Sequence, residues 1–83
     1  MRLLKFYADW CDPCKRVGPL VDAIAAKASV PVEPVDVDES PSVAEVYDVR
    51  SVPTFVLLDG DRIVFQGSGA QCIPALSTAL KGV

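Results

Sequence analysis

The sequence predicts an α/β protein in which a four-stranded mixed sheet is covered by helices. Strand-like hydrophobic runs alternate with segments of helical periodicity in the order β-α-β-α-β-β-α. An Asp-Gly pair separates the last two strand-like runs, which is typical of a hairpin. Hydrophobic residues make up 51% of the 83 residues, enough for one small core. We therefore expect residues 1–83 to form a single domain.

The first strand is expected at residues 3–8, where Lys5 is the only charged residue and both faces should be largely buried. A helix should follow from the cysteines to about Ala28, because Pro13 suits a first helical turn. Its apolar stripe consists of Val17, Leu20, Val21, Ile24 and Ala25. Pro19 lies inside this helix and is expected to kink it.

A second strand is expected at residues 30–37, parallel to the first because a helix connects the two. Two prolines in this run remove backbone donors, so the strand should lie at a sheet edge. Ser40 and Pro41 are typical of a helix start, and the helix should end near Asp48. This helix would carry the apolar residues Val43, Ala44, Val46 and Tyr47.

The C-terminal part predicts a hairpin and a helix. Residues 54–58 and 62–66 should pair as antiparallel strands around the Asp-Gly pair at 59–60. The last helix is expected from about Pro74 to Lys81, with Gly82 as its end.

Charge and composition exclude several classes of protein. The net charge is −3 and the eight Lys and Arg residues are scattered, so we expect no nucleic-acid binding. No apolar run approaches the roughly 20 residues of a membrane span. The N-terminus reaches Asp9 too early for the core of a signal peptide, which favours the cytosol. The absence of histidine excludes Cys-His catalysis and imidazole metal sites.

The Cys-Asp-Pro-Cys segment at 11–14 is the candidate active site. Its spacing at a helix start brings both thiols to one face, close enough for a disulfide. Cys11 should lie where unpaired N–H groups and the helix dipole stabilise a thiolate. Cys14, one turn further in, should be less exposed. We therefore expect Cys11 to attack a substrate disulfide and Cys14 to resolve the mixed disulfide.

Two other readings of the cysteine pair remain open at this point. A Cys-x-x-Cys can be half of a zinc site, but the chain has no second pair and only Cys72 besides. A structural disulfide is disfavoured in a reducing compartment. Cys72 itself is interpreted as an inert, partly buried thiol, with a regulatory or dimerising role as the alternative.

Two motifs resemble those of the thioredoxin family, and the likeness extends over essentially the whole chain. Residues 6–15 contain Trp-Cys-Asp-Pro-Cys-Lys, close to the Trp-Cys-Gly-Pro-Cys-Lys usual in that family. Residues 47–55 contain Ser-Val-Pro-Thr, in which thioredoxins carry a cis proline that faces the cysteine pair. A weaker match is Gly-Ser-Gly-Ala at 67–70.

The resemblance implies roles for the residues around the two thiols. Pro53 would be the cis proline, and the backbone of Val52 would pair with an extended substrate peptide. Gly69 would let the substrate approach closely. Trp10, directly before the nucleophile, would rim the site together with Asp12 and Pro13.

Three departures from the family pattern affect the same site. The family's N-terminal strand and helix are missing, so we expect a minimal thioredoxin-like fold of about glutaredoxin size. Lys5 stands where thioredoxins carry a buried aspartate, and Pro34 stands where they carry its lysine partner. If Lys5 points at Cys14 it would lower the thiol pKa; the favoured alternative is that Lys5 extends into solvent. Proton transfer would then rely on water or on Asp9.

The third departure is Asp12, which replaces the usual glycine. A carboxylate beside the Cys11 thiolate opposes the helix dipole and should raise the thiol pKa. A less stabilised thiolate makes the couple more reducing. Asp12, like Lys5, is therefore a candidate for tuning the redox potential.

The resemblance implies a protein-disulfide reductase that needs no cofactor beyond its Cys11–Cys14 disulfide and no metal. Its partners would be protein disulfides and a flavin-dependent thioredoxin reductase or a similar donor, and it would act as a monomer. A glutathione-linked, glutaredoxin-like reductase is the first alternative, although glutaredoxins commonly carry Cys-Pro-Tyr-Cys. A binding module that stabilises another protein is the second, and retention of both cysteines argues against that as the sole role.

Overall fold

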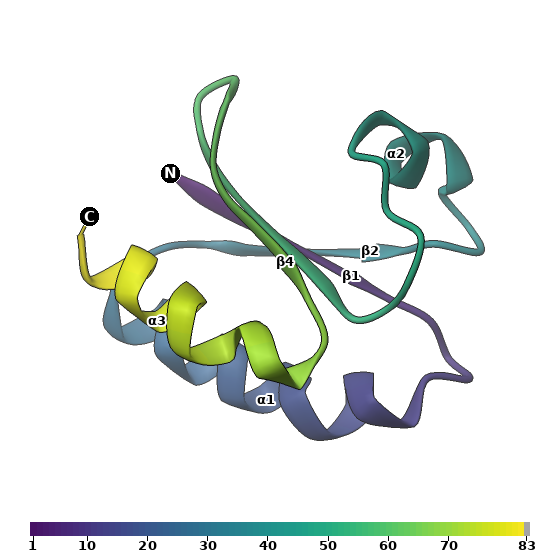
Figure 1. Ribbon diagram of the computed structural model, residues 1–83, viewed down its shortest axis with the longest axis horizontal. Coiled ribbons are helices and arrows are strands. Elements are labelled where there is room, and N and C mark those ends of the chain that lie inside the picture. The colour runs from purple at the N-terminus through teal and green to yellow at the C-terminus, as the bar shows by residue number, and fades with distance from the viewer. Residues whose placement is uncertain (83) are drawn as a thin grey trace.

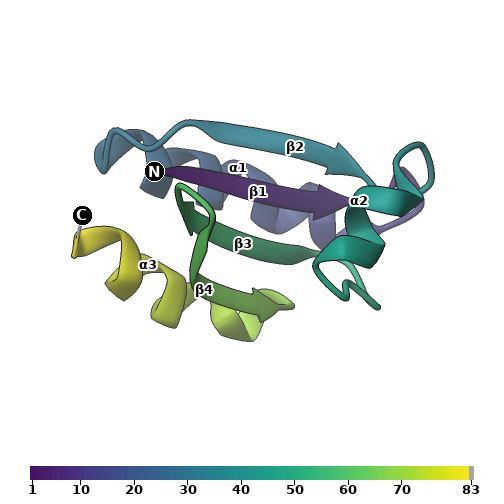
Figure 2. The same ribbon diagram turned by 90° about the horizontal axis from the view of Figure 1, so that it is seen from above.

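Four strands form one mixed sheet in the computed structural model, which describes residues 1–82. The strands are β1 (Arg2–Tyr7), β2 (Val32–Asp36), β3 (Thr54–Asp59) and β4 (Arg62–Ser68). They lie in the order β2-β1-β3-β4, with β2 at an edge as predicted (Figure 2). β1 pairs with β2 in parallel, and the other two pairs are antiparallel. The predicted topology is confirmed over these residues, while Val83, the last residue of the expected domain, lies outside them.

Helices cover both faces of this sheet. They are α1 (Asp12–Lys27), α2 (Pro41–Val46) and α3 (Ile73–Lys81), the last preceded by a short 3₁₀ turn at Ala70–Cys72. Figure 1 shows α1 and α3 on one face and α2 on the other. The first helix starts directly after β1, which places the cysteines at one end of the sheet.

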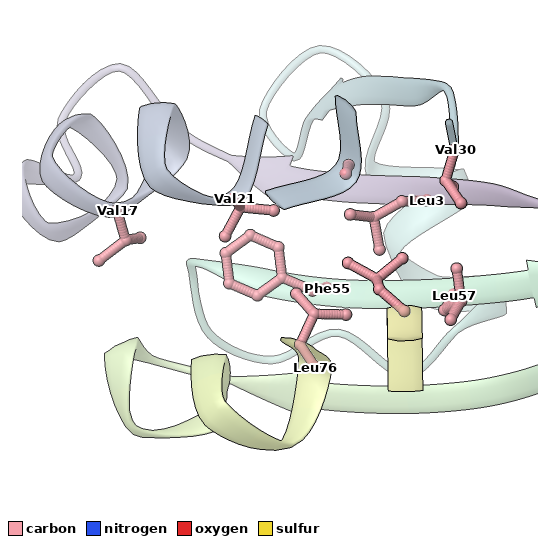
Figure 3. Close-up of a cluster of buried hydrophobic side chains, with 9 residues drawn as sticks. Leu3, Val17, Val21, Val30, Phe55, Leu57 and Leu76 are labelled. Atoms are coloured by element: carbon pink, nitrogen blue, oxygen red, sulfur yellow. The ribbon is translucent and has the colours of Figure 1, made fainter. Parts of the chain in front are cut away.

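The alternation of side chains along the strands divides the core between the two faces. Leu3 and Phe55 pack with residues of α1 and α3, as Figure 3 shows. Leu4 and Phe6 of β1 point to the other face and pack with Val56 of β3 and with Ala44 of α2. Lys5 lies two residues after Leu3 and therefore belongs to the face that α1 covers.

Local details differ from the sequence-based expectations around α2 and the hairpin. The helix spans only six residues and ends before Asp48, and its apolar residues Val43 and Val46 are exposed. So short a helix covers little of the sheet, and Ala44 is its one buried residue. Ser40 is the N-cap but makes no side-chain cap bond. The hairpin turn lies one residue later than expected, because Asp59 still pairs with Arg62.

Gly18, in the middle of α1, provides a test of local packing. A Cβ at this position would meet only the Lys5 ammonium nitrogen, at 3.6 Å, which is an ordinary contact distance. Alanine also loses less backbone entropy than glycine inside a helix. We expect Gly18→Ala to raise the free energy of unfolding in urea by about 0.5–1 kcal/mol.

The matched control is Gly60→Ala, in the hairpin turn. That glycine has open space around it but a φ of +61°, a conformation that alanine adopts only with strain. Gly60→Ala should therefore destabilise the fold. A loss of stability in Gly18→Ala as large as in Gly60→Ala would show that the space beside Lys5 does not accept a methyl group.

Candidate redox site

The two cysteines of the Cys-Asp-Pro-Cys segment are joined as a disulfide at the start of α1. Cys11 is the N-cap residue, with extended backbone, and its Cα lies 5.3 Å from that of Cys14. Its Sγ accepts a hydrogen bond from the backbone N–H of Cys14 at 3.2 Å. A sulfur at this position occupies the place of a capping oxygen, where N–H groups and the helix dipole favour a negative charge. The geometry can therefore stabilise a thiolate at Cys11.

The relative exposure of the two cysteines is the reverse of the expectation. Cys11 is only 3% exposed, whereas Cys14 is partly exposed. The N-cap geometry accounts for this, because it turns the Cys11 side chain towards the first turn of its own helix. The backbone N–H of Cys11 is also tied to the carbonyl of Ala8 at 3.1 Å, which closes the chain around it.

Trp10, directly before the disulfide, lies on the surface with 69% of its area exposed. Its indole Nε1 donates a hydrogen bond to Oδ2 of Asp38, at 2.9 Å. Asp12 and Pro13, in the first turn of α1, are exposed beside it. Nothing in the sequence indicated this pair, because no local pattern links residues 28 positions apart.

A cis peptide bond joins Val52 and Pro53, as the resemblance implied. Pro53 lines the same cavity as Cys14, and its carbonyl accepts the backbone N–H of Gly69 at 2.8 Å. Gly69 has a φ of +76°, which explains the glycine at this position. The fold thus brings together Cys14, Pro53 and Gly69 from three separate segments. Val52 does not line the cavity and packs instead against the core under α2.

The cavity beside Cys14 has a volume of about 320 Å³ and lies between α1 and the end of β1. Four charged residues line it: Lys5, Asp9, Lys15 and Asp22. The ammonium of Lys5 bonds to both carboxylate oxygens of Asp22, at 3.0 and 3.1 Å. The Lys5 side chain is only 18% exposed and that of Asp22 is 49% exposed.

The expectation that Lys5 extends freely into solvent is therefore wrong. Lys5 belongs to the sheet face that α1 covers, so its side chain reaches the helix and finds a carboxylate there. Pro34, which pairs with Lys5 in the sheet, lines the same cavity and offers no side-chain charge. Asp22 was not among the site residues expected from the sequence, although one feature of the sequence could have indicated it. Residues 14, 18 and 22 are spaced by four and thus share a helix face.

Two groups near the site have shifted pKa values. Burial raises the pKa of the Cys72 thiol, which keeps that free cysteine protonated at neutral pH and agrees with its interpretation as an inert thiol. Partial burial, together with the carboxylates of Asp36, Asp9 and Glu39, raises the pKa of the Tyr7 hydroxyl. Both groups are therefore uncharged at neutral pH.

Residues 1–82 contain no cluster of three or more histidine, cysteine or acidic side chains that could hold a metal ion. Across the same residues, none of the helices has both the length and the apolar character needed to cross a bilayer.

Known proteins resemble this chain in both sequence and structure. The family model named Thioredoxin matches residues 1–82. Thioredoxin 1 of Synechococcus elongatus is 48% identical over 64 residues, which is 74% of this chain and 60% of that protein. Thioredoxin 1 of Nostoc is 40% identical over 81 residues, covering 95% of this chain and 76% of that protein. The chain thus spans less than two thirds of the Synechococcus relative's length and about three quarters of the Nostoc relative's.

A solved structure provides the comparison of folds. Thioredoxin 1 of the thermophilic bacterium Thermosipho africanus superposes with a TM-score of 0.90 at 27% identity, covering 99% of this chain and 92% of that one. The family match extends over the whole sheet, its helices and both cysteines. This chain belongs to the thioredoxin family.

Proposed function

We propose that the chain is a thiol–disulfide oxidoreductase that reduces protein disulfides through a dithiol–disulfide cycle of Cys11 and Cys14. The observation that carries this is the position of Cys11 as N-cap, with its sulfur bonded to the N–H of Cys14 and within disulfide distance of the second sulfur. Family membership supports the same activity.

The cycle has two thiol exchange steps. The Cys11 thiolate attacks one sulfur of the substrate disulfide, and the other substrate sulfur leaves as a thiolate. The Cys14 thiolate then attacks Cys11, which forms the Cys11–Cys14 disulfide and releases the second substrate thiolate. The substrate gains two electrons and the cysteine pair loses two. An external donor must then reduce the pair.

The substrate would lie across the exposed rim and the cavity mouth. Aromatic area from Trp10 and backbone groups near the cis proline can hold an extended peptide beside the disulfide. Gly69, whose backbone N–H bonds to Pro53, adds no side chain of its own beside the cis bond, and the Gln71 side chain occupies the adjoining space. The proposed substrate-contacting residues are Trp10, Asp12, Pro13, Val52, Pro53 and Gly69.

The proposal includes the setting in which the protein works. Residues 1–83 act as one domain and as a monomer, with no cofactor beyond the cysteine pair. A reductant of this kind works in the reducing cytosol. The electron donor is a flavin-dependent thioredoxin reductase or a similar dithiol donor, a choice that the thioredoxin-like Cys-Asp-Pro-Cys sequence supports.

Reduction of insulin disulfides tests this function and its electron source together. The protein is assayed with NADPH and a thioredoxin reductase, and separately with glutathione, glutathione reductase and NADPH. We expect insulin reduction in the first system to exceed that in the second. Faster turnover with glutathione would favour the glutaredoxin-like alternative, and no reduction with either donor or with dithiothreitol would refute the enzymatic proposal.

Asp12 offers a test of redox tuning. Its exposed carboxylate lies in the first helical turn beside Cys11, where a negative charge opposes formation of the thiolate. We expect Asp12→Asn to raise the reduction potential by roughly 10–30 mV, since solvent and salt screen part of the effect. The potential is measured by equilibration with glutathione buffers at low ionic strength.

The control for Asp12→Asn is Glu45→Gln, which removes the same charge from an exposed position in α2. It should leave the potential unchanged. A fall in potential in Asp12→Asn, or equal shifts in both variants, would contradict the proposed role of Asp12.

A further inference from the structure

The ion pair in the cavity beside Cys14 joins two elements that meet only through the tertiary fold. Lys5 comes from the middle of β1 and Asp22 from the second half of α1. We propose that Lys5, held in place by Asp22, stabilises the thiolate of Cys14 and so promotes the release of reduced substrate. Lys5 and Asp22 would then be positioning residues for the second step of the proposed function, on which this inference rests.

Helical spacing places the ammonium on the same side of α1 as Cys14. Cys14, Gly18 and Asp22 follow one another at intervals of four residues and share one face of the helix. The Lys5 ammonium bonds to Asp22 and lies 3.6 Å from the Cβ position of Gly18. Four residues correspond to a rise of about 6 Å along the axis, so the charge lies roughly one to two turns from Cys14.

The space between the ammonium and Cys14 is open. Both residues line the cavity of about 320 Å³, and Gly18 places no side chain between them. Because the Lys5 side chain is only 18% exposed, its charge is less screened by solvent than a surface charge would be. A cation in such a position favours the charged form of a nearby thiol.

The carboxylate of Asp22 has two opposing effects. By bonding to the ammonium through both oxygens, it keeps the Lys5 side chain against the helix. Its own negative charge opposes a thiolate, but it is more exposed than Lys5 and lies two helical turns from Cys14. The ammonium lies beside Gly18, one helical turn from Cys14, so its charge should outweigh that of the carboxylate at Cys14.

The other titratable groups around Cys14 do not provide an equivalent charge. Within residues 1–82, those lining the cavity besides the ion pair are Tyr7, Asp9 and Lys15, and Asp12 lies in the adjoining first turn. Tyr7 is neutral at physiological pH, and the other three are exposed. Exposed charges act weakly through solvent and salt, so among these groups Lys5 is the mostly buried charge in the cavity that Cys14 lines.

The step that this charge serves is the attack of Cys14 on the mixed disulfide. The Cys14 thiol first loses its proton to solvent, and its thiolate then forms a bond to the Cys11 sulfur. The bond between Cys11 and the substrate sulfur breaks, and the substrate leaves as a thiolate that takes up a proton. Stabilising the Cys14 thiolate increases the fraction of mixed disulfide that is ready to react at neutral pH.

Titration of Cys14 as the only thiol tests the inference directly. In a Cys11→Ser/Cys72→Ser background, the ultraviolet absorbance of the thiolate reports the pKa of Cys14 without coupling to a second thiol. We expect Lys5→Met to raise that pKa by roughly one unit. Asp22→Asn should lower it by a smaller amount, because the amide oxygen still accepts a bond from the ammonium while the opposing charge is removed.

Two further variants separate charge from structural damage. Lys5→Arg keeps the charge and should leave the pKa of Cys14 within a few tenths of a unit of that of the parent protein. Arg2→Met removes a cation and an exposed ion pair with Glu33 from the same strand, so it should not change the titration. A general loosening of the fold would move the variants of Lys5 and Asp22 in the same direction, whereas the charge effect moves them in opposite directions.

An unchanged Cys14 titration in Lys5→Met, or shifts of the same sign in Lys5→Met and Asp22→Asn, would overturn the inference. If Lys5→Met does not fold, the shifts in Asp22→Asn and Lys5→Arg still decide it. The titration does not depend on activity, so it is separable from the insulin assay. Insulin reduction by the parent protein with no shift in the variants would refute the role of Lys5 alone.

Discussion

Replacing Cys11 with serine is expected to reduce the rate of insulin disulfide reduction by about a thousandfold or more. A serine hydroxyl stays protonated at neutral pH, so it cannot replace the thiolate that the N-cap position stabilises. Cys14→Ser should also lose turnover, but for a different reason. It should still form the mixed disulfide and then fail to release it. Mass spectrometry after a single addition of a disulfide substrate distinguishes the two variants.

Cys72→Ser is the matched control, because that cysteine forms no disulfide and burial raises the pKa of its thiol. It should retain the parent rate. The same experiment tests the order of attack, because Cys14 is the more exposed of the two cysteines. A stable mixed disulfide formed by Cys11→Ser, and none formed by Cys14→Ser, would assign the first attack to Cys14. Substantial activity in a Cys11→Ser/Cys14→Ser double variant would favour the binding-module alternative.

Phe55→Ala is expected to lower the free energy of unfolding by about 3–5 kcal/mol. Phe55 has no exposed surface, lies in the larger core cluster and also lines the cavity beside Cys14 (Figure 3). Small domains lie towards the lower end of the usual range of about 5–15 kcal/mol, so this loss would remove a large part of the total stability. Urea denaturation followed by circular dichroism measures the loss.

The control for core packing is Phe65→Ala, which truncates the same kind of side chain at a partly exposed position on β4. The loss of stability there should be clearly smaller, since less apolar area leaves water when that ring packs. Equal losses in the two variants would show that the core is not centred on Phe55.

Much of the fold follows from short-range patterns. The strand with two prolines lies at the sheet edge because each proline lacks a donor that a central strand needs. The hairpin follows from a glycine with positive φ between two β-type runs. The apolar residues of α2 did not indicate which of them would be buried, since Ala44 is buried whereas Val43 and Val46 are exposed. A helix of six residues makes fewer than two turns, so the spacing of its apolar residues does not show which side of the helix is buried.

The candidate site also has features that short-range patterns predicted and one that they did not. The placement of the cysteine pair at a helix start follows from Pro13 and the apolar stripe that comes after it, and the cis bond before Pro53 was expected from the motif around it. The burial of Cys11 was not predicted, because spacing alone does not show that its sulfur turns inward to cap the helix.

The sequence by itself determined the order of the elements, the edge strand and the position of the two thiols, because propensity, capping and turn chemistry act over a few residues. Only the tertiary structure decided the partners of Lys5 and Trp10. Asp22 lies 17 residues from Lys5, and Asp38 lies 28 residues from Trp10. Such pairs form when β1, α1 and the segment after β2 pack together, so the ion pair in the cavity beside Cys14 is a property of the folded protein.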